Sequence, residues 1–194
     1  MDMKEHVNAI CRACYCHIRN IGKVRRHLTQ DAAKTLVHSF VASKVDHLNA
    51  LLYGIPKYVL KKLQKIQNTA ARIVTRTRRR EHITPVLIEL HWLPIEYRIQ
   101  YKILLTTFKA LHGLAPGYIS DLIVRYNPSR VTRSANLSLL KEIEAEYITF
   151  GERSFKFCAP NLWNKLPLQL RQLDELTIFK GQLKTHLFTK AYPD

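Results

Sequence analysis

The sequence lacks the residue groupings on which common catalytic sites depend. Its six glycines are scattered, so it has no glycine-rich loop to hold a phosphate group. Its aspartates are all separated from one another, whereas two-metal nucleotidyl transfer needs clustered carboxylates around ions roughly 4 Å apart. Neither an HExxH nor a GxSxG motif occurs. We therefore predict that this chain is not an enzyme and uses no cofactor.

Cysteine is also scarce, and its pattern does not complete a zinc site. Cys11, Cys14 and Cys16 are followed by His17, which resembles half of such a site. A structural zinc ion needs four ligands, usually arranged as two pairs, and the remaining cysteine, Cys158, has no second ligand at the usual spacing. We predict no metal and expect reduced cysteines along a helix, with Cys11 and Cys14 on one face. A bound metal is the alternative.

Long apolar runs are absent too. No stretch of 18 consecutive apolar residues occurs, so we expect no transmembrane helix. The first residues, MDMKEHVNAICRACYC, contain acidic side chains and no apolar segment ahead of a small-residue cleavage site, so they do not indicate a signal peptide. We therefore expect an intracellular protein.

Acidic residues are few compared with basic ones. The 194 residues include 31 Lys and Arg but only 15 Asp and Glu, which gives a formal charge of +16. A compact monomer tolerates such a charge poorly unless a polyanion compensates it. Nucleic acid is the favoured partner, and an anionic membrane surface is the alternative. The 46% hydrophobic content is enough to bury a core, in one domain or in two small, closely packed ones.

Apolar spacing predicts a mainly α-helical protein. The first helix should cover residues 3–20 and end at Gly22. Asp31 should cap a second helix, which Gly54 and Pro56 stop. Further helices are expected over residues 57–77, 84–90, 95–112, 116–124 and 177–188.

The segment HWLP separates two of these helices. Thr84 should cap the short helix before it, with Pro85 early in the first turn, where a missing N–H is tolerated. Trp92 and Leu93 have apolar neighbours on both sides. We therefore expect both to anchor the core; the alternative is a platform on which bases stack. The helix over residues 95–112 is apolar nearly all round and should lie at the centre of the core.

The chain should form two regions joined by a loop. Residues 1–124 are expected to form a helical bundle, residues 125–136 a polar basic loop, and residues 137–192 a smaller, C-terminal helical region. Two short apolar runs in this last region, LSLLK and YITF, are compatible with a β-hairpin between Leu137 and Phe150. The apolar segment over residues 152–170 follows, with Pro160 and Pro167 as interruptions.

The helix over residues 57–77 shows the clearest functional pattern. Leu60, Leu63, Ile66, Ala70 and Val74 share one face, and cationic side chains recur every three or four residues on another. Nine basic residues and no acidic one occur over residues 57–80. A solvated helix face normally mixes charges, because like charges at i and i+4 destabilise the helix. We call the following eight residues the basic stripe: Lys57, Lys61, Lys65, Arg72, Arg76, Arg78, Arg79 and Arg80.

The basic stripe is predicted to contact nucleic-acid phosphates, which would offset its internal repulsion. The alternative is an ordinary solvated surface of a basic protein. The run Arg78, Arg79 and Arg80 could also act as a nuclear localisation signal, so we expect the protein in the nucleus.

Five segments spread over nearly the whole chain carry a family resemblance. The first is ITPVLIELHWLPIEYRI, over residues 83–99. It resembles the region that follows the polymerase core in LINE-type, non-LTR retrotransposon reverse transcriptases of the jockey and chicken-repeat-like group. The other segments are LVHSFVASKVDHLNALLYGIP (36–56), LKKLQKIQNTAARIVTRT (60–77), KILLTTFKALHGLAPGYISDLI (102–123) and FGERSFKFCAPNLWNKLP (150–167).

This resemblance implies the thumb and the region after it, without the palm that carries the catalytic aspartates. The function that it implies is contact with the template–primer backbone during target-primed reverse transcription. Its implied partners are element RNA, an RNA–DNA or DNA duplex, and the missing palm of the parent RNA-directed DNA polymerase. The alternative is a domesticated helical module that binds a protein and has no nucleic-acid role. Binding to a membrane surface is disfavoured, because the basic helix has no aromatic residue beyond Tyr58.

Overall fold

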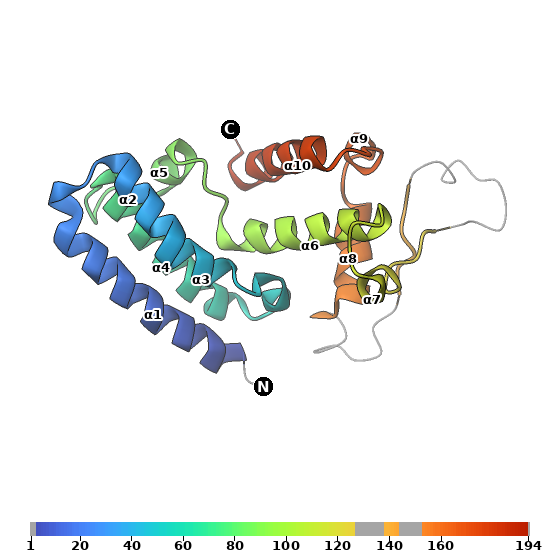
Figure 1. Ribbon diagram of the computed structural model, residues 1–194, viewed down its shortest axis with the longest axis horizontal. Coiled ribbons are helices and arrows are strands. Elements are labelled where there is room, and N and C mark those ends of the chain that lie inside the picture. Colours follow the sequence, from blue (N-terminus) through green and yellow to red (C-terminus); the bar gives the residue numbers. More distant parts are fainter. Residues whose placement is uncertain (1–2, 127–137, 144–152, 194) are drawn as a thin grey trace. The chain divides into compact units, whose positions relative to one another are not determined.

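A computed structural model describes residues 3–126, 138–143 and 153–193 of the chain (Figure 1). The described residues are mainly α-helical, as predicted, and contain no strand longer than an isolated bridge. The chain divides into two compact units, Met1–Arg98 (unit 1) and Ile99–Asp194 (unit 2). The division falls inside a helix, and the expected regions 1–124, 125–136 and 137–192 stay a prediction. Residues 127–136 of the expected loop lie outside the described part.

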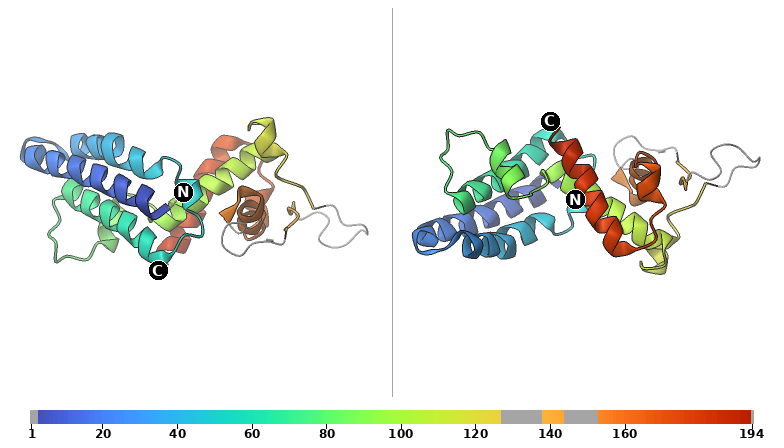
Figure 2. Two further views of the ribbon diagram at one scale, coloured as in Figure 1. Left: turned by 90° about the horizontal axis from the view of Figure 1, so that it is seen from below. Right: turned by 90° about the horizontal axis from the view of Figure 1, so that it is seen from above.

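Unit 1 contains a row of helices that lie side by side (Figures 1 and 2). Its α-helices are α1 (Met3–Val24), α2 (Gln30–Val37), α3 (Ser43–Asp46), α4 (Lys57–Thr75) and α5 (Thr84–Glu89). Three tighter or wider turns join them, namely η1 (Arg25–His27), the π-type η2 (His38–Ala42) and η3 (Asn49–Leu52). Helix α6 (Ile95–Leu111) begins in unit 1 and continues into unit 2.

The core of unit 1 is aliphatic, and α4 contributes most to it. Leu63, Ile66, Ala70 and Val74 are buried, as the apolar pattern predicts, whereas Leu60 is half-buried. Helix α1 buries its own apolar residues against this face, because its apolar side chains recur at the same helical spacing. These residues are Val7, Cys14, Ile18 and Ile21. Trp92 and Leu93 are also buried, so the prediction that they anchor the core is confirmed.

Several predicted helix ends are wrong. Gly22 does not end the first helix, because α1 continues to Val24 and packs there against α4; a Cβ atom on Gly22 would lie 3.9 Å from Ile73 Cδ1. Thr29, not Asp31, caps α2, because the extended backbone of Thr29 lets its Oγ1 accept from Ala32 N at 3.2 Å.

The second predicted helix is not continuous. It runs through α2, η2 and α3 to Asp46 and then breaks at Leu48, whose φ of 54° lies in the left-handed region. The break places Asp46 where its carboxylate accepts from the Arg98 guanidinium at the start of α6, with Nε donating to Oδ1 at 2.9 Å. This partly buried ion pair involves two donors of one guanidinium, which is the stronger geometry for such pairs.

Unit 2 is made of shorter helices. After α6 it contains α7 (Gly117–Ser120), α8 (Phe155–Asn164), α9 (Leu168–Arg171) and α10 (Leu176–Ala191). The expected helix over residues 116–124 is therefore much shorter than predicted. Pro160 was expected to interrupt its segment, but it lies inside α8. A proline there removes a helical hydrogen bond, and we attribute its tolerance to burial of the same turn, which includes Cys158, Ala159 and Trp163.

The core of unit 2 is aromatic. Phe108 and Phe179 stack with ring centroids 4.2 Å apart, and Trp163 lies 5.9 Å from Phe179. All three side chains are at most 1% exposed. Rings at these separations add to the free energy of area burial. Unit 2 is thus organised around a few large side chains on α6, α8 and α10.

The segment 138–143 is attached to α8 by side chains of the NLWN sequence. Asn164 accepts from Leu140 N and donates to Leu140 O, both at 2.9 Å, and Trp163 Nε1 donates to Ser138 O at 3.0 Å. Leu140 also forms an isolated antiparallel bridge with Arg125. Most of the predicted hairpin, namely Leu137 and residues 144–150, lies outside the described residues. In a separate part of unit 2, Pro116 precedes α7 as its N-cap residue.

Candidate nucleic-acid interface

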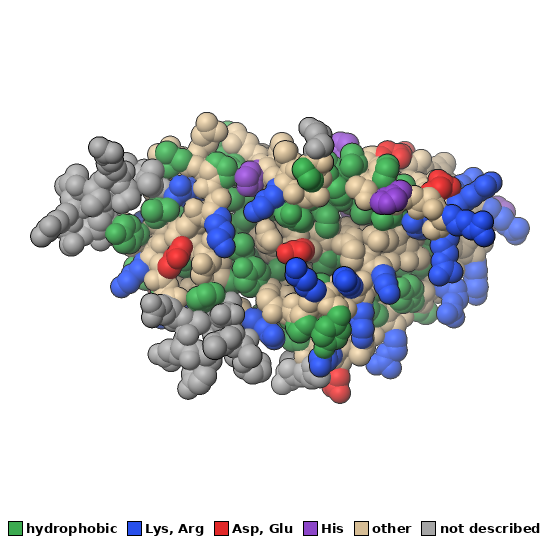
Figure 3. Space-filling model, turned by 180° about the vertical axis from the view of Figure 1, so that it is seen from behind, with side chains coloured by type: hydrophobic (Ala, Val, Ile, Leu, Met, Phe, Trp, Pro, Cys, Tyr) green, Lys and Arg blue, Asp and Glu red, His purple; other side chains and the backbone are tan. Residues whose placement is uncertain are grey.

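The first half of the basic stripe is an open row of lysines on α4. Pro56 precedes the helix as its cap, and Lys57, Lys61 and Lys65 follow at intervals of four residues, all exposed. Positions four apart are about 6 Å apart along a helix axis, so the three ammonium groups form a row on one face. Lys and Arg side chains gather over this surface (Figure 3, right). No member of the basic stripe forms a salt bridge within the described residues.

Helix α1 runs alongside α4 in the same direction and adds polar groups beside this row. Lys62 Nζ donates to Asn8 Oδ1 at 2.8 Å, and the Lys4 ammonium lies 5.8 Å from the centroid of the Tyr58 ring. The two contacts fix the start of α1 against the start of α4. Lys62 is the one basic residue of segment 57–80 that is not part of the basic stripe, and it is turned toward α1 and away from the row.

Arg72 differs from the lysines because its guanidinium holds a turn. Its Nη1 donates to Arg78 O and its Nη2 to Glu81 O at 2.7 Å. Both acceptors lie in the turn after α4 that carries Arg78, Arg79 and Arg80. Arg72 thus fixes the backbone of that turn, whose three arginine side chains are exposed.

Glu81 also stabilises this turn. Its Oε1 accepts from Arg78 N at 3.1 Å, so the carboxylate binds backbone and leaves the guanidinium of Arg78 without a salt bridge. The segment over residues 57–80 contains no acid, as the sequence shows. Glu81, the first acid after it, accepts a hydrogen bond from the backbone and neutralises no side chain of the segment by a salt bridge among the described residues.

Arg76 and Arg25 form a reciprocal pair, which we call the arginine clasp. Arg25 donates from Nε to Ile73 O and from Nη2 to Val74 O, both at 2.7 Å, and so satisfies carbonyls at the end of α4. Arg76 Nη2 donates in return to Arg25 O at 3.2 Å and to Arg26 O at 3.4 Å. The clasp therefore joins the end of α1 to the end of α4.

The clasp brings further positive charge to the end of the basic stripe. Desolvation, followed by the neighbouring Arg76 charge, lowers the pKa of Arg25. Arg26, next to it, is exposed. Sequence reasoning missed Arg25 and Arg26, because spacing along one helix cannot show that another helix ends beside it. The run Lys23, Arg25 and Arg26 was the available signal.

The structure thus separates the predicted site residues into two groups. Lys57, Lys61 and Lys65 are open to solvent, and so are Arg78, Arg79 and Arg80. Arg72 and Arg76 lie on the same surface, but Arg72 donates two guanidinium nitrogens, and Arg76 one, to backbone carbonyls. An extended phosphate backbone could contact the open groups without displacing any of these hydrogen bonds.

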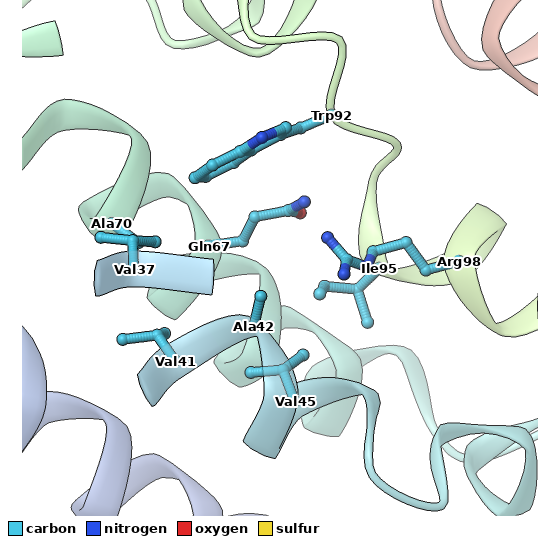
Figure 4. Close-up of a pocket in the computed structure, with 9 residues that line it drawn as sticks. All are labelled: Val37, Val41, Ala42, Val45, Gln67, Ala70, Trp92, Ile95 and Arg98. Atoms are coloured by element: carbon cyan, nitrogen blue, oxygen red, sulfur yellow. The ribbon is translucent and has the colours of Figure 1, made fainter. Parts of the chain in front are cut away.

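Unit 1 also contains a small apolar cavity under Trp92 (Figure 4). Its volume is about 20 Å³, enough for about one water molecule. Gln67 is hydrogen-bonded beside it: its Nε2 donates to Leu93 O at 2.8 Å and its Oε1 accepts from Gln64 Nε2 at 2.9 Å. This cavity is too small for a substrate.

The cysteines are not arranged as metal ligands. Among the described residues, no group of three or more His, Cys, Asp or Glu side chains could hold a metal ion. Burial raises the pKa of Cys14 to about 11 and that of Cys158 to about 11, so both thiols are protonated at neutral pH. Cys11 is half-buried with a raised pKa, and Cys16 is exposed.

In the parts of the chain that the structure covers, no helix is both long and apolar enough to cross a membrane. No protein-family model, no curated protein and no solved structure matches the chain.

Proposed function

We propose that this chain is a nucleic-acid-binding fragment of a LINE-type reverse transcriptase, comprising its thumb and the region after it. The fragment holds a template–primer duplex through the phosphate backbone and contains no catalytic centre. The origin rests on the resemblance of the five sequence segments. The binding activity rests on a separate observation, the unpaired row Lys57, Lys61 and Lys65 on the exposed face of α4.

The arrangement of the basic stripe supports backbone binding over base recognition. Its side chains are lysines along one helix and arginines in one turn, and such contacts position a duplex without reading its sequence. Tyr58 is the exposed aromatic residue among them. The proposed ligands are therefore element RNA, an RNA–DNA hybrid or a DNA duplex, bound with little sequence preference.

The structure indicates which variant tests this proposal cleanly. Replacing Arg72 or Arg76 would also remove hydrogen bonds to backbone carbonyls, so a loss of binding could reflect a disturbed fold. Replacing Lys57, Lys61 and Lys65 by Gln removes three charges with no such contact, and Gln is nearly as good a helix former. The matched control replaces Lys102, Lys180 and Lys184, which are exposed helical lysines of unit 2.

We expect the wild-type chain to bind duplex with an affinity that falls steeply as salt rises. The triple variant K57Q/K61Q/K65Q should flatten the slope of log K against log salt by about 2 to 3, because each phosphate contact contributes about 0.9. The control variant should change it by less than about 1. Fluorescence anisotropy with duplexes of unrelated sequence measures both. Equal slopes for the two variants would show that the row is an ordinary solvated surface.

A second candidate function is protein binding by a domesticated helical module. Leu48 and Leu51 favour it, because they are 54% and 53% exposed and Leu48 has a left-handed backbone that a leucine rarely adopts. In the first proposal the missing palm is the partner for such residues. If the chain bound a protein partner with an affinity that salt does not change, and did not bind duplex, the second candidate would be favoured. The expected nuclear location belongs to the first proposal.

A further inference from the structure

A second set of cationic side chains runs along α1, outside the basic stripe. Its members recur at intervals of seven, four and three residues, which places them on one face of α1 and of its continuation into η1. They are Arg12, Arg19, Lys23 and Arg26, and all four are exposed. We call them the α1 row. At 1.5 Å per helical residue, the row extends over about 20 Å.

The charges of the α1 row are open to a ligand. Arg12, Arg19 and Lys23 form no salt bridge and no side-chain hydrogen bond within the described residues. Arg26 donates from Nε to His27 Nε2 at 2.8 Å, which occupies one of the five N–H donors of its guanidinium. The row therefore keeps its positive charge at the surface.

The acidic residues of unit 1 do not neutralise this surface. Unit 1 is described throughout from Met3 to Arg98. Glu5 is the only acidic residue of α1, and it lies seven positions before Arg12, about 10 Å along the helix axis. At the other end, Glu81 accepts from the backbone N–H of Arg78. The α1 row thus lies between these two acids without pairing to either.

The α1 row and the lysines of α4 lie on one surface. We call Lys57, Lys61 and Lys65 the lysine row. Helices α1 and α4 lie side by side (Figures 1 and 2), and the bond from Lys62 Nζ to Asn8 Oδ1 joins them. Asn8 lies one turn before the α1 row on its face, and Lys62 borders the lysine row, so the two rows flank this bond. Packed helix axes are about 8–10 Å apart, which places the rows roughly 10 Å apart.

The α1 row supplies open charge where the basic stripe has least. Gly22 lies against Ile73, so the end of α1 is level with the last turns of α4. Arg19 and Lys23 are within one turn of Gly22 and share this level. The two stripe residues in the same turns of α4 donate guanidinium nitrogens to backbone carbonyls. Here the open cations belong to α1.

Two open rows match a duplex better than a single strand. A duplex presents two lines of phosphates, which face each other across grooves about 6 Å and 12 Å wide in B-form DNA. Rows roughly 10 Å apart, on long flexible side chains, can each reach one line. A single strand has one line and can occupy one row at a time. Tyr15, 41% exposed, is the one Phe, Tyr or Trp of α1, whereas proteins that bind single strands stack successive bases on several rings.

We propose that the α1 row and the lysine row bind the two strands of one duplex, one strand each, so that unit 1 selects duplex over single-stranded nucleic acid. This inference rests on the proposed function and adds strand selectivity to it. The ligand is a pair of phosphate backbones across one groove, in an RNA–DNA hybrid or in a DNA duplex. Phosphate contacts carry no base information, so the selectivity is for strand number and not for sequence.

The test compares one labelled pyrimidine-rich strand, alone and paired with its complement, on the full chain. The variant R12Q/R19Q/K23Q removes three charges of the α1 row and no hydrogen bond within the described residues, and Gln is nearly as good a helix former. On the duplex it should flatten the slope of log K against log salt by about 2 to 3. On the single strand the change should be less than about 1, because the lysine row remains. Fluorescence anisotropy measures both slopes.

Two further variants separate charge from fold. R12K/R19K keeps both charges and should retain the wild-type slope on the duplex, since phosphate contacts need the charge and not the guanidinium. The control variant of unit 2 should change that slope by less than about 1. Equal flattening on duplex and single strand by R12Q/R19Q/K23Q would place both rows on one strand and overturn the proposal. An unchanged slope on the duplex would do the same.

The lysine variant distinguishes this proposal from the proposed function. If K57Q/K61Q/K65Q flattens the slope on the duplex and R12Q/R19Q/K23Q does not, the two-strand proposal fails and the proposed function stands. If neither variant flattens it, both fail. If both variants flatten it, the variant that combines all six substitutions should flatten it by about 4 to 6, because contacts to different strands add.

Discussion

Unit 1 and unit 2 carry their positive charge in different ways. Unit 1 contains 18 Lys and Arg against seven Asp and Glu, a formal charge of +11, whereas unit 2 contains 13 against eight, or +5. In unit 1 the cations form an open row on a long helix, continued by an exposed turn. In unit 2 the described Lys and Arg residues are distributed over α6, α8, α9, α10 and the segments between them. An open row on one helix suits an extended polyanion better than cations distributed over several short helices do.

The two units also differ in what holds them together. Unit 1 packs aliphatic side chains at regular helical spacing, from Val7 in α1 to Val74 in α4. Unit 2 has shorter helices, a proline inside α8 and a core of stacked rings. A regular aliphatic face distributes the burial over many residues. An aromatic cluster concentrates it in a few, so single substitutions should affect unit 2 more strongly.

We expect the largest effect from a substitution that disrupts the core of unit 2. Phe179→Ala removes a ring that stacks on Phe108 and contacts Trp163, which should cost about 3–5 kcal/mol of unfolding free energy. Hydrogen exchange should show lost protection in α8 and α10 before α1 and α4. A conservative change in unit 1, Ile66→Val, removes only one methyl group and should cost about 0.5–1.5 kcal/mol. Equal loss of protection in both units after Phe179→Ala would show that they unfold as one.

The next effect tests the arginine clasp in unit 1. Arg25→Gln removes donors to Ile73 O and Val74 O and should destabilise unit 1 by about 1–2 kcal/mol, because carbonyls at the end of α4 lose their partners. Arg76→Gln removes longer, exposed bonds and should cost at most about 0.5 kcal/mol. Chemical denaturation followed by circular dichroism measures both. A larger cost for Arg76→Gln would reverse the roles that we assign within the clasp.

The smallest effect compares one buried thiol from each unit. Burial raises the pKa of Cys14 in unit 1 and of Cys158 in unit 2, each to about 11, so each thiolate forms only as the pH rises toward that value. At pH 8 we expect both thiols to react with iodoacetamide more than about a hundredfold more slowly than a free cysteine. Exposed Cys16 should react first. Rapid labelling of Cys158 alone at pH 8 would show that unit 2 opens more readily than unit 1.

Much of unit 1 was predictable because its signals are periodic and local. The spacing of Leu63, Ile66, Ala70 and Val74 predicted both α4 and its buried face, since a helix places such positions together. Termini were harder to predict. Gly22 and Pro160 are helix breakers in isolation, yet both lie inside helices, and Pro160 lies in a buried turn. Capping by Thr29 instead of Asp31 depended on the backbone of one residue, which the residue type does not fix.

The candidate sites divide in the same way. The sequence by itself determined the helical part of the basic stripe, because Lys57, Lys61 and Lys65 recur every four residues and share a face in any fold that keeps α4 helical. Only the tertiary structure decided that Arg72 and Arg76 hold backbone carbonyls while the lysines stay open, because those carbonyls belong to a turn and to another helix. The same holds for the aromatic core of unit 2. Phe108, Trp163 and Phe179 lie far apart in the sequence, and no periodicity relates them; packing of α6, α8 and α10 brings their rings together.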